Sequence, residues 1–416
     1  CLNEGCIPTK TLLHSAKLYD HALDSAAYGV TAESVRVDHA AVIARKERVI
    51  KTLVGGVCAA MKASGVTTVN GRAVITGKDP AGYSVKANGD RYVGKNLIIA
   101  TGSESVLPPI EGLRESLNSG FAVTNRELLF SCEAPKRLVV VGGGVIGLEM
   151  ASYYQMTGTA VTVVEMMDHI AGPCDKDLVK LLQKNYERGG MRFELNACVK
   201  AIGNSRVLCQ RGGETFDLEA DRVLVALGRR PNSQDLGLES IGVLLENGAV
   251  RTDCHMRTNV PGIYAVGDIN GKSMLAHTAY REAEVAVHTI LGQKDTMSYR
   301  AIPSVLYTIP ELSSVGLTEE EAKAQGLDVA VVRIPMAYSG RYVAENENGD
   351  GIFKLVIDKK LRTVVGAQVL ANYSSEFIAV VGIFIELAVP IDLIKKQVFP
   401  HPTVAEIIRE AACQFA

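Results

Sequence analysis

The chain lacks both an excess of charge of either sign and a long apolar segment. Its 416 residues carry 44 Lys and Arg against 46 Asp and Glu, which gives a net charge of −2. Such a balance creates no strong field toward nucleic acid or an anionic membrane. The longest near-continuous apolar run, residues 377–385, is far short of the ~20 residues that span a bilayer. We therefore expect neither a nucleic-acid partner nor a membrane partner.

Cysteine is also scarce. Nine cysteines are too few for a disulfide scaffold in a chain of this length, and they are scattered except for Cys1 and Cys6. No second Cys or His pair stands at zinc-ligand spacing, so no metal site is expected. An odd count with one close pair is typical of a reducing compartment. The predicted location is the cytoplasm, or the mitochondrial matrix if the source is eukaryotic.

Length and residue pattern predict an α/β protein of two to four domains. A fully apolar strand at 138–141 is followed by a glycine turn, a helix over Val145–Met156 and a second strand over 160–165. Because apolar strands of this kind are covered on both faces, this βαβ unit predicts a parallel sheet. Further strands are predicted at 97–100, 223–226, 263–266, 353–357 and 364–369, and further helices at 11–23, 42–61, 375–387 and 403–412.

The glycine turn carries a dinucleotide-binding pattern. Gly142, Gly144 and Gly147 match G-x-G-x-x-G directly after a strand and at a helix start. The first glycine permits the turn, the second lets the backbone approach a pyrophosphate, and the third lets helix pack on strand. Glu165 ends the next strand, where a carboxylate accepts from the ribose hydroxyls of NAD and repels a 2′-phosphate. The alternative is a turn without ligand and a surface carboxylate, but the whole context favours NAD binding.

The pair Cys1 and Cys6 could cycle between dithiol and disulfide. That chemistry needs sulfurs that reach each other and one that is open to attack. If Cys6 begins a helix, for which Pro8 suits the first turn, the positive helix end favours its thiolate. Two unrelated thiols, or half of a metal site, are the alternatives.

A single histidine near the C-terminus stands between two prolines. Pro400 and Pro402 restrict where the ring of His401 can point. Glu406 could accept from one ring nitrogen and make the other a poised acid–base. The residues Thr403 and Glu406 also form a capping-box pattern, which alone could explain them.

Asp268 has two interpretations, whereas Lys10 and Glu149 look like ordinary charged residues. Asp268 follows the strand at 263–266, where α/β folds place ligand contacts, but aspartate is also a common helix N-cap. Lys10 and Glu149 could each be a solvated surface charge, which is the usual state of such residues.

In this combination and order, the chain resembles the flavin-dependent pyridine nucleotide–disulfide oxidoreductases, and among them the dihydrolipoamide dehydrogenases. The motifs that carry the resemblance are residues 1–10, 145–149, 274–277, and 401–403 with Glu406. It covers essentially the whole chain. The resemblance implies two Rossmann-like domains, for FAD and NAD, and a C-terminal α+β dimerisation domain. The implied ranges are 1–112 (FAD, its N-terminal part missing), 113–238 (NAD), 239–300 (FAD-binding return segment) and 301–416 (interface).

The resemblance also implies a role for each catalytic residue. Cys1 would be the interchange thiol and Cys6 the thiolate against the flavin. His401, held by Glu406, would move the thiol proton and reach the disulfide of the other subunit, which implies a homodimer. Lys10 and Glu149 would pair with each other near the flavin N5.

Cofactor contacts follow in the same way. For FAD, the implied contacts are Asp268 on the ribityl chain, Met274, Leu275, Ala276 and His277 at the flavin pyrimidine, Lys10, and Thr101, Gly102, Ser103 and Gly71 along the dinucleotide. For NAD, they are Gly142, Gly144, Val145, Ile146, Gly147, Glu149, Glu165, Val199 and Gly228.

The implied activity is the reoxidation by NAD of dihydrolipoamide on a lipoyl-bearing protein of a 2-oxo acid dehydrogenase or glycine cleavage complex. Val145 stands where glutathione reductases usually keep a gating tyrosine, which favours lipoamide. Two alternatives remain: a reductase of glutathione- or coenzyme A-type disulfides, and a non-catalytic fragment that binds NAD and dimerises.

The sequence departs from the family pattern in three places. It opens at Cys1, so we expect a first FAD-binding βαβ segment of about 40 residues upstream. Pro400 precedes the histidine where a small residue is common, and residues 338–341 differ from the usual local pattern. Both of the latter departures could alter substrate access.

Overall fold

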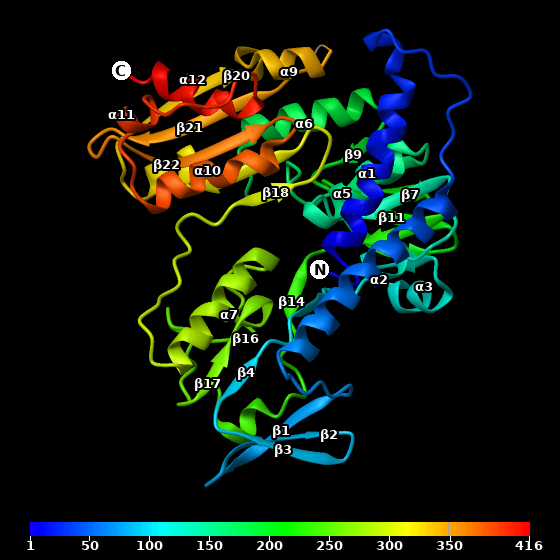
Figure 1. Ribbon diagram of the computed structural model, residues 1–416. Helices are drawn as coiled ribbons and strands as arrows, with labels where there is room; N and C mark the ends of the chain where they lie inside the picture. The colour runs from blue at the N-terminus through cyan, green and yellow to red at the C-terminus, as the bar shows by residue number, and fades with distance from the viewer. Residues whose placement is uncertain (348) are drawn as a thin grey trace. The chain divides into compact units, whose positions relative to one another are not determined.

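The computed structural model describes residues 1–347 and 349–416 (Figure 1). The chain divides into two compact units. Unit 1 contains Cys1–Leu53, Leu107–Leu227 and Arg300–Ala416, and unit 2 contains Val54–Val106 and Gly228–Tyr299. These units group the chain by compactness and not by function, so the four predicted domain ranges stay a prediction. Across the described residues, no helix combines the length and the apolar content needed to cross a bilayer.

Unit 1 contains the predicted parallel sheet. Its strand order is β6-β13-β7-β8-β9. Successive side chains of a strand point to opposite faces, so Leu138 and Val140 join one core while Val139 and Val141 join another. The sheet is thus covered on both faces, as its apolar strands predict. The strand bounds are β6 Ala122–Val123, β13 Arg222–Val225, β7 Arg137–Val141, β8 Ala160–Val164 and β9 Arg192–Glu194.

Helices cover one face of this sheet, and α1 lies alongside α5 (Figure 1). Their bounds are α1 Cys6–Leu23, α5 Val145–Met156 and α6 Lys176–Arg188, and the first turns of α2 (His39–Ala63) join the same core. The other face is covered by α3 (Leu113–Ser119) and an antiparallel meander of β10 (Cys198–Gly203), β11 (Arg206–Arg211) and β12 (Glu214–Glu219). The short helix α4 (Asn125–Leu128) follows β6, and η1 (Ser25–Tyr28) follows α1.

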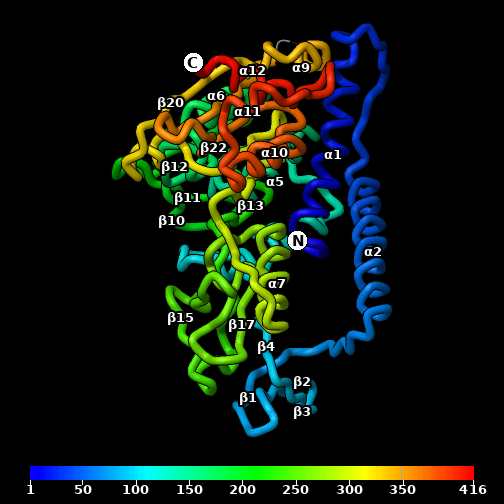
Figure 2. Tube along the Cα trace, turned by 60° about the vertical axis from the view of Figure 1, so that its left-hand side comes forward, coloured from blue at the N-terminus to red at the C-terminus, as the bar shows by residue number. Residues whose placement is uncertain are grey.

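The C-terminal part of unit 1 is a five-stranded antiparallel sheet in the order β18-β19-β22-β21-β20. Figure 2 shows α10, α11 and α12 gathered near the C-terminus, where α10 packs on β19 and β22 and α12 packs on β20 and β21. On the opposite side of β21, buried Lys354 pairs with buried Asp175 at 2.5 Å, and Asp175 also caps α6. The bounds are β18 Ser304–Leu306, β19 Leu312–Gly316, α8 Glu319–Ala324, β20 Val329–Pro335, η4 Met336–Tyr338, α9 Gly340–Glu345, β21 Ile352–Asp358, β22 Thr363–Leu370, α10 Ser374–Glu386, α11 Ile391–Ile394, η5 Val404–Glu406 and α12 Ile407–Gln414.

Unit 2 is built around the parallel pair β4 and β17, whose Ile99 and Ile263 share a core with Ile75 and Tyr83. An antiparallel meander, the short hairpin of β15 and β16, the two-stranded pair of β5 and β14, and one long helix complete it. The bounds are β1 Ala73–Asp79, β2 Gly82–Ala87, β3 Asp90–Gly94, β4 Leu97–Ile99, β5 Ser103–Ser105, β14 Arg229–Pro231, η2 Leu238–Ile241, β15 Leu245–Glu246, β16 Ala249–Val250, β17 Ile263–Ala265, η3 Gly267–Asn270 and α7 Ala276–Ile290.

Candidate functional site

Cys1 and Cys6 form a disulfide, with their Cα atoms 4.5 Å apart. Helix α1 begins at Cys6, with Gly5 as its N-cap, which is five residues before the predicted start at Thr11 and meets the condition set for a thiolate at Cys6. The unsatisfied N–H groups at that end carry partial positive charge, which favours a thiolate when the pair is reduced. Cys1 is exposed and Cys6 is half-buried. The pair thus offers one sulfur to an incoming thiol and keeps the other closer to the protein.

Lys10 and Glu149 form a partly buried ion pair. Lys10 lies one turn after Cys6 on the same face of α1, and its Nζ is 2.7 and 2.9 Å from the two carboxylate oxygens of Glu149 on α5. Glu149 is buried and also accepts from the backbone N–H of Tyr307 at 3.0 Å, while Lys10 lies 4.5 Å from the centre of the Tyr307 ring. The interpretation of two separate surface charges is therefore wrong. The contact with Tyr307 had no signal in the sequence, because it involves a backbone N–H.

His401 and Glu406 also meet. His401 Nδ1 lies 2.9 Å from Glu406 Oε1, and Glu406 Oε2 accepts from the Thr403 backbone N–H at 2.7 Å. Both predicted contacts of Glu406 are present, since its carboxylate caps the turn and orients the ring, and the acid–base role of His401 stays a prediction. The Thr403 N–H, and after it His401, hold the pKa of Glu406 below its usual value. The His401 side chain is 79% exposed, so its other nitrogen is open to an incoming molecule.

The glycine turn between β7 and α5 has the geometry that the sequence predicts. Gly142 has φ +105°, and a Cβ there would strike the carbonyl oxygen of Ala226. A Cβ on Gly147 would strike the carbonyl oxygen of Gly142 and would lie 3.1 Å from Val140. Gly144 is the N-cap of α5, which Val145 and Ile146 begin, and a Cβ there would meet nothing within 4 Å. Two glycines are thus needed for packing, and Gly144 leaves open space at the helix end.

Glu165 follows β8 and lies beside this turn. Its Oε2 accepts from the Gly143 N–H at 2.7 Å and its Oε1 from the Met167 N–H at 2.8 Å. A carboxylate has about four lone-pair sites, so two remain for the hydroxyls of a ribose. Glu165 is therefore held in place at the turn and keeps capacity to accept from a ligand.

The glycine turn allows a test that separates packing from ligand binding. We expect Gly147→Ala to lower the free energy of unfolding by about 1–3 kcal/mol, because its methyl group must displace backbone. Gly144→Ala should change that free energy by less than ~1 kcal/mol and should still weaken NAD⁺ binding, because its methyl group enters the open space. Denaturant unfolding without coenzyme and NAD⁺ titration measure the two effects. Equal destabilisation by both variants would contradict the assignment.

In unit 2 the structure brings Ser103 and Asp268 together. Ser103 Oγ donates to Asp268 Oδ2 at 2.5 Å, and Arg229 Nε donates to Ser103 Oγ at 2.7 Å. Asp268 lies in the first turn of η3, whose N-cap is Val266, so the N-cap interpretation of Asp268 is wrong. Arg229 was not predicted, since only the pairing of β14 with β5 places it beside Ser103.

The residues around Ser103 complete this arrangement. Thr101 Oγ1 donates to the Asn232 carbonyl at 2.9 Å, and Gly102 has φ +70°. The Gly228 carbonyl accepts from the Val106 N–H at 3.0 Å, and Gly228 has φ +93°. Gly102 and Gly228 therefore serve the turns at the two ends of this pairing, whatever their part in binding.

Glu282 is a residue that the sequence analysis missed. It is fully buried on α7 and accepts from the Gly267 N–H at 2.6 Å, from Asn270 Nδ2 at 2.9 Å and from the Tyr299 hydroxyl at 2.6 Å. Burial, and then Glu282, raises the pKa of Tyr299. These bonds fix the turn that carries Asp268. A glutamate in the middle of a helix gives no sign in the sequence of such a role.

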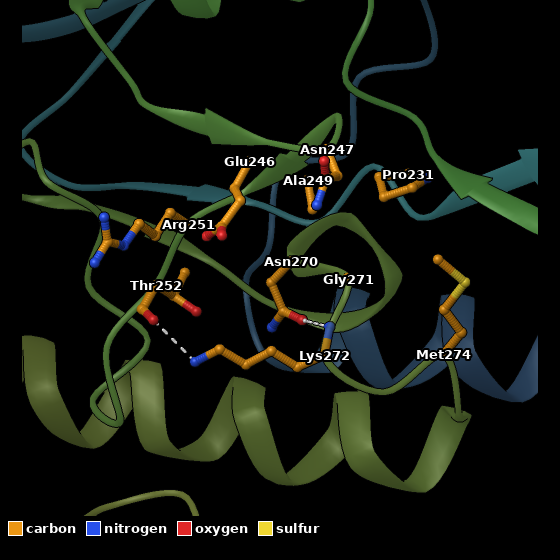
Figure 3. A pocket seen from close by; sticks show the side chains of 10 residues that line it. All are labelled: Pro231, Glu246, Asn247, Ala249, Arg251, Thr252, Asn270, Gly271, Lys272 and Met274. Atoms are coloured by element: carbon orange, nitrogen blue, oxygen red, sulfur yellow. Dashed lines mark hydrogen bonds between the residues drawn. The ribbon is translucent and has the colours of Figure 1, made fainter.

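The segment after this turn borders a hollow of about 400 Å³ in unit 2 (Figure 3). Met274 lines it, together with Asn270 and Lys272, whose backbone N–H donates to Asn270 Oδ1. Leu275 is the N-cap of α7, and Ala276 and His277 form its first turn.

Two predicted residues stand apart from the clusters described above. Gly71 precedes β1, where a Cβ would strike the Asn88 side chain. Val199 lies in β10 and packs against the core of unit 1. The binding roles of both residues stay predictions. Within 1–347 and 349–416, no three His, Cys, Asp or Glu side chains are placed to hold a metal ion.

Comparison with known protein families explains why these features occur together. Residues 1–283 match the family described as pyridine nucleotide-disulphide oxidoreductase, and residues 302–412 match the dimerisation domain of the same family. The chain belongs to the pyridine nucleotide-disulphide oxidoreductases. This membership makes it an oxidoreductase of an FAD-dependent family that also uses NAD or NADP. The C-terminal domain supports a homodimer.

Curated relatives match almost the whole of this chain. The chain is 38% identical over 418 residues to a dihydrolipoyl dehydrogenase of Geobacillus stearothermophilus, covering 99% of this chain and 87% of the relative. It is 37% identical over 419 residues to a dihydrolipoyl dehydrogenase of Bacillus subtilis, covering 99% and 88%.

Solved structures share its fold. The HOCl-induced flavoprotein disulfide reductase RclA from Escherichia coli superposes with a TM-score of 0.87 at 27% identity, over 100% of this chain and 91% of that one. LpdA from Mycobacterium tuberculosis superposes with a TM-score of 0.89 at 24% identity, with the same coverage. The predicted fold of FAD and NAD Rossmann-like domains with a C-terminal dimerisation domain is confirmed.

The residues present fit the cofactors that the family implies. On the NAD side, the space at Gly144 and the remaining acceptor sites of Glu165 suit a pyrophosphate and a ribose. On the FAD side, Asp268 is bonded to Ser103 through one oxygen and can accept from ribityl hydroxyls through its remaining lone pairs.

Proposed function

We propose that this protein oxidises dihydrolipoyl groups with NAD⁺, using FAD and the Cys1–Cys6 pair. The reaction converts a dihydrolipoyl group and NAD⁺ to a lipoyl group, NADH and a proton. The observation that carries the proposal is the disulfide at the start of α1, one turn from the Lys10–Glu149 pair. The two dihydrolipoyl dehydrogenases at 37–38% identity support the substrate class.

The cysteine pair performs the thiol chemistry. A substrate thiolate attacks Cys1, the exposed sulfur, and forms a mixed disulfide while Cys6 leaves as a thiolate. The second substrate thiolate then displaces Cys1, so the lipoyl disulfide forms and the pair is left reduced. The N-terminal end of α1 stabilises the charge on Cys6.

His401 moves the protons of this exchange. Its Nε2 takes a proton from the substrate thiol, because Glu406 holds Nδ1 and so leaves Nε2 as the accepting nitrogen. The exposed side chain suits a histidine that acts on the Cys1–Cys6 pair of the other subunit in a homodimer.

Bound FAD would take the two electrons of the cysteine pair and pass them as hydride to NAD⁺. Asp268, which is bonded to Ser103, would accept from the ribityl hydroxyls of FAD. Lys10, whose ammonium is kept in place by Glu149, is the residue that the family pattern assigns to the flavin N5. The coenzyme would be held by the turn at Gly142–Gly147, where the charge of Glu165 disfavours a 2′-phosphate.

The proposed partners are a second copy of this chain and the lipoyl-bearing protein of a 2-oxo acid dehydrogenase or glycine cleavage complex. Cytoplasm, or the mitochondrial matrix in a eukaryote, is the proposed location.

One rival function has its own support. The likeness to RclA, a flavoprotein disulfide reductase, at 27% identity favours a reductase that acts on other disulfides.

A substrate panel decides between these functions. The FAD-loaded protein is assayed for NADH formation with dihydrolipoamide, reduced glutathione and reduced coenzyme A, and for NADH oxidation with their disulfides. We expect kcat/KM for the lipoamide pair to exceed the others by at least ~10²-fold, since a site built for one substrate rejects the rest at the transition state. Comparable values for glutathione or coenzyme A would favour the rival, and no turnover at all would favour a non-catalytic fragment.

Coenzyme choice gives a separate prediction. Glu165→Gln should lower kcat/KM for NAD⁺ about tenfold, because charged acceptors for the ribose hydroxyls become neutral. The same change should raise kcat/KM for NADP⁺, because the repulsion of a 2′-phosphate is removed. Steady-state kinetics with both coenzymes measure this, and Glu33→Gln, at an exposed glutamate, is the matched control. An unchanged ratio of the two coenzymes would count against Glu165.

A further inference from the structure

The backbone between Cys1 and Cys6 is held by bonds within the loop. The Ile7 N–H donates to the Cys1 carbonyl at 3.2 Å, and Thr9 Oγ1 donates to the Gly5 carbonyl at 2.7 Å. Gly5 packs closely as well, since a Cβ there would lie 3.2 Å from the Cys1 Cα. These contacts hold the two ends of the loop and leave its middle, at Glu4, to be held from outside.

Two consecutive residues of α4 contact Glu4 from a distant part of the chain. Asn125 Nδ2 donates to the Glu4 carbonyl at 3.0 Å, and an Arg126 guanidinium nitrogen lies 2.7 Å from the Glu4 carboxylate. Asn125 is buried, whereas the side chains of Arg126 and Glu4 are both exposed. Exposed ion pairs contribute little, so the buried amide is the stronger hold.

The anchor itself is rigid. Helix α4 begins directly after strand β6 of the parallel sheet, and Thr124 with Glu127 forms a capping box around its first turn. The next two residues after this turn, Leu128 and Leu129, are buried in the main core of unit 1. The position of Asn125 is therefore set by α4 and the core, and does not depend on its contact with the loop.

We propose that Asn125 is a positioning residue that sets the thiol–disulfide equilibrium of Cys1 and Cys6. Closing a disulfide requires the loop to bring its sulfurs together, and an ordered loop does so at a smaller entropic cost. The amide of Asn125 orders the middle of the loop and so favours the closed form. This inference rests on the proposed function only in taking Cys1 and Cys6 as the redox-active pair.

The test uses exchange with dithiothreitol. In this exchange dithiothreitol gives two electrons and two protons, closes to its cyclic disulfide and converts the Cys1–Cys6 disulfide to two thiols. The FAD-loaded protein is equilibrated without oxygen in buffers of stepped dithiol-to-disulfide ratio and quenched with acid. Free thiols are then alkylated, and mass spectrometry gives the fraction of Cys1 and Cys6 that was reduced.

Asn125→Asp keeps the shape of the side chain and removes the donor. We expect its equilibrium constant for closing the disulfide to fall about fivefold. The effect is smaller than the full free energy of the hydrogen bond, because part of that free energy also stabilises the dithiol form and cancels. That corresponds to a midpoint potential about 20 mV less negative. Arg126→Gln, which removes only the exposed ion pair to the same Glu4, should change the constant less than twofold.

The outcomes separate the two proposals. If the wild-type pair cycles reversibly and Asn125→Asp has the same equilibrium constant for closing the disulfide, the role of Asn125 is overturned and the proposed function stands. If Arg126→Gln shifts the constant as much as Asn125→Asp, the role of Asn125 is also overturned. If the wild-type pair does not cycle, both proposals fail. Should Asn125→Asp not fold, as judged by circular dichroism, Asn125→Ala provides the same comparison without a carboxylate beside the Glu4 carbonyl.

Discussion

Cys6→Ser should abolish dihydrolipoamide oxidation, with kcat falling on the order of 10⁴-fold or more, the scale that follows removal of a covalent nucleophile. Serine cannot form the disulfide with Cys1, and its hydroxyl does not ionise at neutral pH. Binding of NAD⁺ should be unchanged, because the glycine turn begins at Gly142 and makes no use of the sulfur. Steady-state NADH formation and a separate NAD⁺ titration measure the two properties.

A matched control removes a thiol without touching the pair. Cys58 is an exposed free cysteine on α2, so Cys58→Ser should retain wild-type turnover. If Cys6→Ser oxidises dihydrolipoamide at the wild-type rate, the redox role of the disulfide is wrong. If Cys58→Ser is as inactive as Cys6→Ser, general damage by cysteine loss explains the result instead.

The second large effect is expected at His401. His401→Gln should slow reduction of the protein by dihydrolipoamide by about 10²–10⁴-fold, the usual contribution of a general acid–base. Reoxidation by NAD⁺ should change little, because that step involves no thiol proton. Rapid-mixing measurement of each half-reaction separates the two rates. Equal slowing of both would indicate a structural histidine.

The pairing with Glu406 gives this prediction a pH dependence. Its pKa is held below the usual glutamate value, so the carboxylate stays ionised well into the acid range. The ionised carboxylate that orients the His401 ring is therefore present above the usual glutamate pKa and is lost only as pH falls through the lowered value. The rate of reduction by dihydrolipoamide, measured against pH, tests this dependence. His21→Gln, at an exposed histidine in the last turn of α1, is the control and should leave that pH profile unchanged.

Local pattern was sufficient to predict the nucleotide-binding fold. The strand at 138–141, the three glycines and the helix Val145–Met156 all appear in the structure where the sequence places them. They are predictable because each depends on neighbours in the chain: apolar strands, a turn that only glycine fits, and a helix that follows it. The same reasoning missed α6, although Asp175 is a clear N-cap signal directly before it.

Residues whose partners lie far away in the chain could not be predicted in the same way. Glu282, Arg229 and Asn125 look like ordinary polar residues of a helix or a loop. Their roles appear only when folding brings a turn, a distant strand or the redox loop against them. The pairing of Lys10 with Glu149 became predictable only through the family resemblance, because 139 positions separate them.

The buried pair of Lys354 and Asp175 has a consequence for how the molecule comes apart. Asp175 starts a helix of the parallel sheet and Lys354 belongs to the antiparallel sheet, and both side chains are about 1% exposed. Lys354 also has Glu319 at 3.4 Å, so separating Lys354 from Asp175 would leave chiefly the buried Asp175 carboxylate without its ammonium partner. Leaving one member of a buried pair alone costs about 3–5 kcal/mol. Loss of either sheet should therefore destabilise the other, so that we expect the proposed coenzyme site and the dimerisation domain to unfold together.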